Sequence, residues 1–505
     1  MKPVKILLFL VGCLLLLLSL AFVFPENGIP LGSTFTLRFH FSTDKLQGKT
    51  IQYANIESII QENQTIINAD TISLPVTETE EAVDTIRAIA ASLRKKIQTI
   101  EYPYNNLNYL YPFFKKLDNS AKKRVRILHY GDSQIEGDRI TGYLRNRFQK
   151  QFGGSGPGLL PAIPGHAESA SIIHQASANW IKHAVYYKRD TLLPHRQFGL
   201  LGSLARYTTY QQDSAPDENV YKASINFSKS GMAYQTANNF TRFRIFYKHT
   251  HAPVIVKGFV NDSLIWFQEI DSFPKTQTIQ WEFDSTPDNF TVEFEGNTSP
   301  DVYGVALDAL AGVSVDNLPF RGSSGTEFTR LDYSQLKEMA AQLNPGLLIV
   351  QFGVNIVPHR VKSYDYYERI MTRQLKYLKV VMPNTPILVI GLSDMSQRKG
   401  NYYETYPNLE LVKQAQYNAA KNAQCAFWDM YKAMGGRNSM PSWVFAEPPL
   451  ASSDFIHFNR KGGHIIAQML YNALMNEYQL YKQTAYSLAD TKPQETTTKL
   501  KNEAH

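Results

Sequence analysis

The chain has 505 residues, a formal net charge of +7, 43% hydrophobic residues and only 19% charged residues. This length and apolar content allow two or three domains with buried cores, and they exclude a mostly disordered chain, a coiled coil and a polytopic membrane protein. The two cysteines, Cys13 and Cys425, exclude a disulfide scaffold and a cysteine-rich zinc module, and the diffuse positive charge does not favour nucleic-acid binding.

The first 25 residues have the pattern of a membrane anchor or an export signal. Lys2 and Lys5 precede an uncharged run over residues 6–24, whose 19 residues would span about 28 Å as a helix. Because the positive charges precede this run, we expect the rest of the chain outside the cytoplasm. No small-residue cleavage site closes the run, so an uncleaved single-pass anchor is favoured over a cleaved signal peptide. The apolar run continues beyond Cys13, so we interpret the match to a lipidation motif there as accidental.

Residues 26–118 are predicted to be a linker and helical region. No clear period is found up to residue 77. Glu78 and Glu80 then open a helical pattern, whose apolar positions are Val83, Ile86, Ile89, Ala90 and Leu93.

The segments 119–187 and 319–480 have the pattern of an α/β domain. A β-rich run over residues 125–130 stops at Gly131, and an amphipathic helix is predicted over 140–152. Further continuous apolar runs, typical of strands buried on both faces, occupy residues 347–352 and 387–392. Helical patterns precede these runs over 331–343 and 364–382, and a last helix is predicted over 462–478. Together they predict a three-layer α/β/α domain around a flavodoxin-like parallel sheet.

Between residues 188 and 318 the period changes to two. Phe290, Val292 and Phe294 alternate with polar residues, and so do Ile279, Trp281 and Phe283. This alternation predicts an antiparallel β-sandwich inserted into the α/β domain. Its aromatic residues either stack on sugar rings or form its core; they are Trp266, Trp281, Tyr234 and Tyr247. Residues 481–505 are predicted to be a disordered tail.

Four groups of residues that carry chemistry follow the ends of predicted strands or lie in loops. They are Gly131-Asp132-Ser133, the Gly/Ser loop of residues 321–326, Gly353-Val354-Asn355, and the pair Asp454 and His457. Each group alone is more often structural than catalytic. All four in this order, at positions where open α/β sheets build their sites, predict one active site.

In this order the four groups resemble the conserved blocks of the SGNH (GDSL-type) hydrolase family. Ser133 lies in the first block, Gly325 in the second with Gly322 as its competitor, Asn355 in the third, and Asp454 and His457 in the last. The third block departs from the commoner Gly-x-Asn-Asp pattern at Ile356. With its β-insert the chain further resembles bacterial peptidoglycan O-acetylesterases, whose insert is similar to a carbohydrate-binding module.

The residue types suit a serine esterase. Ser133 needs a base to act as a nucleophile, His457 can be that base, and Asp454 can orient the imidazole. The oxyanion would bind the Ser133 N–H, the Gly325 N–H and the Asn355 side-chain amide. The scheme requires no metal and no cofactor. The other histidines are interpreted as surface or core residues: His166, His174, His183, His195, His249, His251 and His359.

The resemblance implies an extracytoplasmic esterase of the cell envelope that removes O-acetyl groups from carbohydrate, with cell-wall glycan as the expected substrate. The alternative is an O-acetyltransferase acting on an exported polysaccharide, with a membrane-bound acyltransferase as its partner. The second alternative is a non-catalytic glycan-binding protein. The two connections to the insert, near residues 186–189 and 315–320, are expected to lie close together.

Overall fold

The computed structural model describes residues 3–23, 29–30, 36–37, 51–61, 97–165, 167, 169–187, 193–216 and 218–490. The chain separates into two units, residues 1–52 and 53–505. The helical pattern predicted over residues 83–93 and the last part of the predicted tail, residues 491–505, lie outside the described residues.

The first unit contains helix α1 (Pro3–Val23) and a short antiparallel pair, β1 (Ile29–Pro30) and β2 (Thr36–Leu37). Within the described part of the chain, no helix combines the length and the apolarity needed to cross a membrane. The single-pass anchor predicted over residues 6–24 therefore has no support from the structure.

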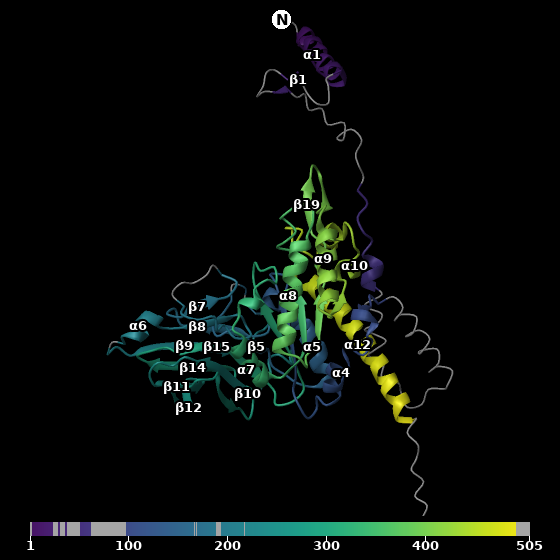
Figure 1. Cartoon of the computed structure of the whole chain (residues 1–505). Helices are drawn as coiled ribbons and strands as arrows, with labels where there is room; N and C mark the ends of the chain where they lie inside the picture. The colour runs from purple at the N-terminus through teal and green to yellow at the C-terminus, as the bar shows by residue number, and fades with distance from the viewer. Residues whose placement is uncertain are drawn as a thin grey trace, which may run out of the picture. The chain divides into compact units, whose positions relative to one another are not determined.

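The second unit contains an α/β part and, beside it, the antiparallel strands of the predicted sandwich (Figure 1). The α/β part is built around a sheet of six strands in the order β16-β4-β17-β18-β21-β3. The strands are β3 (Ile100–Glu101), β4 (Val125–Gly131), β16 (Val313–Pro319), β17 (Pro345–Gln351), β18 (Ile387–Ile390) and β21 (Ala426–Trp428). All neighbours are parallel except β3, which pairs antiparallel with β21. The three apolar runs predicted as strands are β4, β17 and β18, and all residues in these strands are buried.

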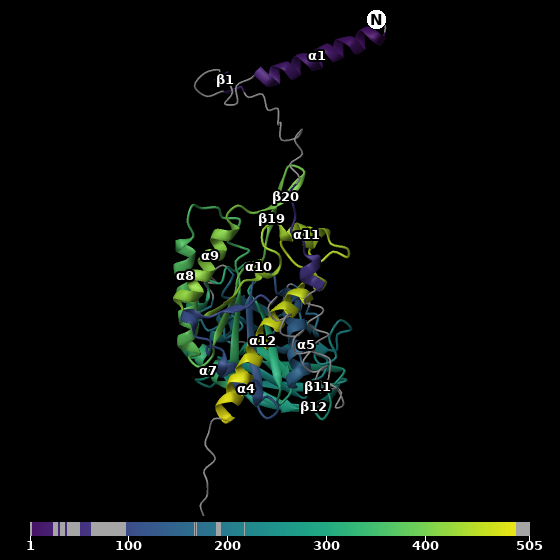
Figure 2. The same ribbon diagram turned by 90° about the vertical axis from the view of Figure 1, so that its right-hand side faces the viewer.

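Helices cover both faces of this sheet and form the predicted α/β/α layers (Figure 2). On one face, Leu128 and Val350 share a core with α7 (Tyr333–Leu343), α8 (Asp365–Val381) and α9 (Leu409–Asn422). On the other face, Ile127 and Ile349 share a core with α4 (Tyr111–Asp118), α5 (Thr141–Phe152) and α12 (Arg460–Asp490). Successive strand residues thus point to opposite layers, as the pleat requires.

Smaller elements complete the α/β part. They are η2 (Pro103–Asn105), η3 (Glu136–Asp138), η4 (Phe328–Arg330), α10 (Met430–Ala433), α11 (Ser439–Phe445) and the hairpin β19 (Ser396–Lys399) and β20 (Tyr402–Thr405). Helix α12 continues to Asp490, so residues 481–490 are helical and not the disordered tail that the sequence predicted. The ring of Tyr481 contacts that of Tyr111, with centroids 4.9 Å apart, which explains why the helix extends this far.

Two antiparallel sheets form the predicted β-sandwich. The first has the order β13-β10-β15-β8-β7, with β5 also paired to β15, and the second has the order β12-β11-β14-β9-β6. Their strands are β5 (Gly158–Leu160), β6 (Ile173–Ala176), β7 (Ile181–Ala184), β8 (Ser203–Arg206), β9 (Tyr221–Ser228), β10 (Arg242–Lys248), β11 (Val254–Val260), β12 (Ser263–Ile270), β13 (Gln277–Glu282), β14 (Asn289–Gly296) and β15 (Asp301–Asp308). Helix α6 (Tyr210–Ser214) follows β8. Phe290, Val292 and Phe294 are buried between the sheets, as the alternation predicted.

The limits of the sandwich differ from the predicted range 188–318. Strands β5, β6 and β7 precede residue 188 and belong to the antiparallel sheets, whereas β16 belongs to the parallel sheet. The sequence of β16 alternates like a sandwich strand, but its backbone pairs in parallel with β4. The two connections do lie together, because the ring of Tyr186 stacks on that of Phe320 with centroids 5.0 Å apart.

The sandwich packs directly against the α/β layers. Phe246 of β10 and Tyr303 of β15 belong to the same core as Leu128 and Tyr130 of β4, so β10 and β15 are buried along their whole length. Arg126 of β4 adds buried ion pairs to Asp308 of β15 and, at 2.5 Å, to Asp316 of β16. The strand that leads to Ser133 is therefore fixed from the sandwich as well as from its own sheet.

Candidate active site

Ser133 lies in the turn that follows β4, at the carboxyl edge of the parallel sheet. Gly131 is level with Pro319 of β16 and Gln351 of β17, so three strands end together there. A Cβ atom on Gly131 would lie 2.9 Å from the Gln351 carbonyl oxygen, which is why the tight turn needs glycine. The neighbouring Asp132 is buried and accepts a hydrogen bond from the Gln134 N–H at 3.0 Å, and burial raises the pKa of Asp132 to about 6.

The structure brings Ser133, His457 and Asp454 into one hydrogen-bonded chain. Ser133 Oγ lies 2.8 Å from His457 Nε2, and His457 Nδ1 lies 2.7 Å from Asp454 Oδ2. With the Nδ1 proton donated to Asp454, Nε2 presents its lone pair to the serine hydroxyl. This is the geometry that a nucleophile, its base and an orienting carboxylate require.

Asp454 is held ionised by its surroundings. Partial burial opposes ionisation, but hydrogen bonds from the His457 ring and from the N–H groups of His457 and Ile456 outweigh it and lower the pKa of Asp454 to about 2. An ionised carboxylate at this position favours the imidazolium that forms when His457 takes a proton.

Two residues that sequence reasoning missed position this loop. Gln134 Nε2 donates to the Ile456 carbonyl at 2.6 Å, and the Phe458 N–H donates to Gln134 Oε1 at 3.4 Å, so the residue next to Ser133 clamps both sides of His457. The ring of Tyr403, from β20, stacks on Phe455 with centroids 3.5 Å apart. The position of Gln134 directly after Ser133 was the only local signal; nothing in the sequence links Tyr403 to residue 455.

The predicted oxyanion residues lie in neighbouring loops. Asn355 Nδ2 donates to the Ser323 carbonyl at 2.8 Å, which fixes the amide and leaves its second hydrogen for a ligand. The Gly325 N–H, predicted to be free, donates to Ser323 Oγ at 2.9 Å. Gly325 is buried, has a φ of +76° and leaves no room for a Cβ atom, which would lie 2.8 Å from the Phe352 ring. Its competitor Gly322 is exposed, and open space surrounds the position of its Cβ.

Residues 284–465 match the sequence model of the GDSL-like Lipase/Acylhydrolase family. The chain carries a GDSL-type hydrolase domain. The match includes Gly325, Asn355, Asp454 and His457 but begins after Ser133, among the last strands of the sandwich. No curated protein sequence matches the chain.

A solved structure shares the fold of most of this chain. A peptidoglycan O-acetylesterase is 22% identical, with a TM-score of 0.58 over 73% of this chain and 96% of that one. A family two carbohydrate esterase from Cellvibrio japonicus is 9% identical, with a TM-score of 0.24 over 60% of this chain and 99% of that one. An acetyl xylan esterase is 16% identical, with a TM-score of 0.25 over 32% of this chain and 81% of that one.

The four aromatic residues that were considered for sugar stacking have different surroundings. Trp266 and Trp281 stack on each other with centroids 4.5 Å apart at the rim of the sandwich core, and Tyr247 is buried. Tyr234 lies in the loop between β9 and β10, where its hydroxyl is 3.1 Å from His464 Nε2 of α12. Tyr234 also lines a cavity together with Arg139, six residues after Ser133.

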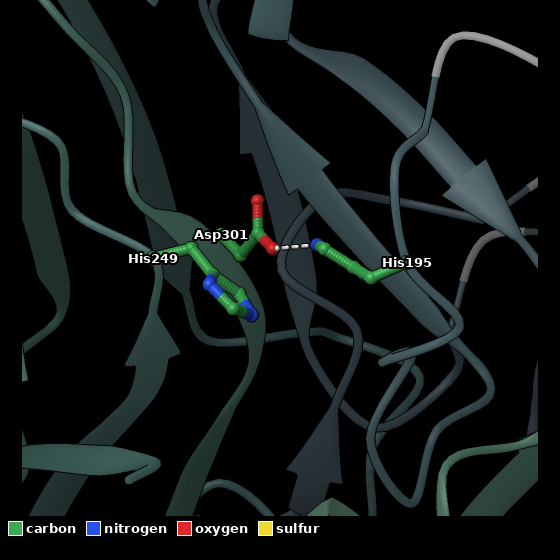
Figure 3. A group of neighbouring side chains, drawn as sticks. All are labelled: His195, His249 and Asp301. Carbon is green, nitrogen blue, oxygen red and sulfur yellow. Dashed lines mark hydrogen bonds and ion pairs between the residues drawn. The ribbon is translucent and has the colours of Figure 1, made fainter. Parts of the chain in front are cut away.

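A cluster of two histidines and an aspartate, which the sequence did not predict, lies in the sandwich (Figure 3). His195 Nε2 is 2.9 Å from Asp301 Oδ2, and the rings of His195 and His249 stack with centroids 4.6 Å apart. His195 Nδ1 accepts the Gln197 N–H at 3.1 Å, so in neutral His195 the proton is on Nε2 and points to Asp301. Arg206 forms a buried ion pair with the same carboxylate. Since no lone pair of His195 is available, the donor set does not fit a metal ion as it stands.

Proposed function

We propose that the chain is a serine esterase that removes O-acetyl groups from carbohydrate, with Ser133 as nucleophile, His457 as base and Asp454 as orienting carboxylate. The observation that carries the proposal is the continuous contact from Ser133 Oγ to His457 and on to Asp454, at 2.8 and 2.7 Å. Ser133 and His457 come from distant parts of the sequence, and their contact supports a single active site.

In the proposed reaction Ser133 Oγ attacks the acetyl carbonyl carbon while its proton passes to His457 Nε2. The tetrahedral intermediate then collapses, and the leaving sugar oxygen takes that proton. A water molecule next gives a proton to His457 and attacks the acetyl-serine, so that acetate leaves and the Ser133 hydroxyl is restored. We assign the oxyanion to the Ser133 N–H and the remaining Asn355 amide hydrogen. Because Ser323 Oγ occupies the Gly325 N–H, we assign Gly325 to shaping its loop.

Carbohydrate is supported as the substrate class by the likeness to the peptidoglycan O-acetylesterase, which extends over 73% of this chain. We propose O-acetylated cell-wall glycan, and a place in the cell envelope. The run of residues 6–24 would keep the enzyme at the membrane or direct its secretion after removal, and the mature N-terminus distinguishes the two.

The test is acetate release from a small activated acetyl ester and from O-acetylated glycan. Ser133→Ala should lower the rate by about 10⁴-fold or more at an unchanged melting temperature. Ser214→Ala, at an exposed position of helix α6, is the matched control and should keep full activity. Activity retained by Ser133→Ala contradicts the nucleophile assignment. Transfer of acetyl groups to added glycan hydroxyls in place of release to water would establish the transferase alternative.

A further inference from the structure

A cavity of about 340 Å³ lies beside the catalytic turn, at the seam between the sandwich and the α/β layers. Its walls include Glu136, three residues after Ser133, Arg321 just after β16, and Lys182 of β7. Apolar side chains such as Leu160 and Tyr186 form much of the remaining wall. The cavity is thus large enough for a sugar residue, and it is reached from the same turn that carries the nucleophile.

A second cavity of about 260 Å³ continues the first along this turn. The two share Glu136, Gly137 and Asp138, and the second is also lined by Arg139, Arg460 and Tyr234. Arg139 Nη1 donates to the Ser133 carbonyl at 3.0 Å, which places this part of the groove next to the nucleophile. The two cavities therefore form one groove that begins at Glu136, three residues after Ser133, and is bounded by the sandwich.

The charges of the first cavity do not balance. Asp138 is neutralised by Arg145 at 2.9 Å, and Glu136 pairs with Arg321 at 3.2 Å. Lys182 remains, and among the described residues no carboxylate lies within ion-pair distance of its ammonium group. Burial lowers the pKa of Lys182, and the nearby Glu136 offsets this only in part. A partly buried ammonium without a partner is costly, and a bound anion would relieve this cost.

The excess of a single positive charge in an otherwise largely apolar cavity matches a singly charged ligand. A hexuronic acid or another sugar with one carboxylate has this charge, and its ring carbons can pack against Tyr186 and Leu160. A neutral sugar would leave Lys182 unpaired. Arg139 and Arg460 in the second cavity form no ion pair with any described residue, so an acidic glycan would meet positive charge along the whole seam.

We propose that the cavity binds a carboxylate-bearing sugar residue of an acidic glycan, with Lys182 as its ion-pair partner. The inference rests on the proposed function, because it places this residue next to the acetylated sugar at Ser133. It narrows the proposed substrate, O-acetylated cell-wall glycan, to a glycan that carries a carboxylate on a sugar residue near the acetyl group.

The experiment compares Lys182→Met with wild type on three acetylated substrates: p-nitrophenyl acetate, xylan, and polygalacturonate acetylated to the same degree as the xylan. We expect KM for polygalacturonate to rise about tenfold with kcat unchanged, because one charge-assisted contact is lost. KM for xylan and for the small ester should stay within about twofold of wild type. Lys182→Arg should largely restore the low KM, and added salt should reduce the difference between variant and wild type.

Lys222→Met is the matched control, because Lys222 lies on β9, outside both cavities, and pairs with Glu295 at 3.3 Å. It should change none of the three reactions. An equal rise of KM on xylan and polygalacturonate, or no rise on either, would overturn the proposal.

A binding measurement separates this inference from the esterase assignment. Ser133→Ala should bind unacetylated polygalacturonate in calorimetry, and the double variant Ser133→Ala/Lys182→Met should bind it about tenfold more weakly. If wild type hydrolyses no ester while this difference in binding is found, the esterase proposal fails and the acidic-glycan site stands. If wild type hydrolyses the esters and the two variants bind polygalacturonate equally, the acidic-glycan site fails and the esterase proposal stands.

Discussion

The described part of the chain contains two histidine–aspartate pairs that have similar contact distances but different surroundings. In the α/β layers, His457 Nδ1 lies 2.7 Å from Asp454 Oδ2, and Nε2 faces the Ser133 hydroxyl. In the sandwich, His195 Nε2 lies 2.9 Å from Asp301 Oδ2, and Nδ1 accepts a backbone N–H. The difference is the partner of the second ring nitrogen. A lone pair that faces a hydroxyl can take its proton, whereas a lone pair bonded to the backbone only holds a loop.

The two carboxylates differ in the same way. Asp301 is fully buried and shared by Arg206, Tyr210 and His195, so its charge is compensated within the sandwich. The Asp454 side chain is 44% exposed, and its hydrogen bonds come only from its own loop. A His–Asp contact therefore indicates catalysis only where a nucleophile faces the second ring nitrogen.

The largest expected difference is between the activities of the variants His457→Ala and His195→Ala. His457→Ala should lower kcat/KM for an acetyl ester by about 10⁴-fold or more at an unchanged melting temperature, because the base is lost. His195→Ala should keep kcat/KM within a few-fold and lower the free energy of unfolding by about 1–3 kcal/mol, because Asp301 loses a buried hydrogen bond. Steady-state kinetics and thermal unfolding of both variants provide the measurement. Loss of activity in His195→Ala at an unchanged melting temperature would contradict the purely structural role of His195.

The aspartates should differ in stability and in its pH dependence. Asp301→Asn should lower the free energy of unfolding by about 3–5 kcal/mol, because it leaves Arg206 with one carboxylate fewer in a buried site. Asp454→Asn should lower the free energy of unfolding by less than Asp301→Asn does. The pKa of Asp454 is lowered from 3.8 to about 2, so its ionised form stabilises the fold fully above about pH 5, and this contribution is lost progressively as the pH falls through 3.8 toward 2.

Denaturant unfolding of wild type and Asp454→Asn between pH 7 and pH 2.5 tests this. The difference between their free energies of unfolding should be constant above about pH 5 and should shrink below it. A difference that grows toward low pH would mean that the Asp454 carboxylate is not stabilised in the folded state.

The smallest effects are expected in the loop that contains both candidate oxyanion glycines. Gly325→Ala should lower the free energy of unfolding by about 2–4 kcal/mol, because its Cβ atom meets the Phe352 ring and its φ is +76°. Gly322→Ala has the same φ but open space, so about 1–2 kcal/mol is expected. Chemical denaturation of the pair measures the difference. Equal losses of unfolding free energy in the two variants would show that backbone strain alone causes the destabilisation and that the contact with Phe352 adds nothing to it.

The sequence predicted the parallel sheet and the three catalytic candidates, because both have local signals. Continuous apolar runs mark β4, β17 and β18, and Ser133, Asp454 and His457 lie in short motifs at predicted strand ends or in loops. The limits of the sandwich had no such signal. Strand β5 has three residues, and β16 alternates like a sandwich strand although it pairs in parallel with β4.

The cluster of His195, His249 and Asp301 also lacks a local signal in the sequence. His195, His249 and Asp301 are each separated by about fifty residues, and only the pairing of distant strands brings them together. The engagement of the Gly325 N–H by Ser323 also depends on the folded conformation of one loop, which composition does not determine.

The pairing of β4 has a consequence for synthesis of the chain on the ribosome. Both neighbours of β4 lie downstream, β16 at residues 313–319 and β17 at residues 345–351. The ion-pair partners of Arg126, Asp308 and Asp316, are also made later than β4. At about 5–20 residues per second, some 10–40 s pass between the emergence of β4 and that of β16. During that time the apolar strand has no sheet to join and needs protection from aggregation. His457 follows Ser133 by 324 residues, so the nascent chain carries an inert serine until its last helix is made.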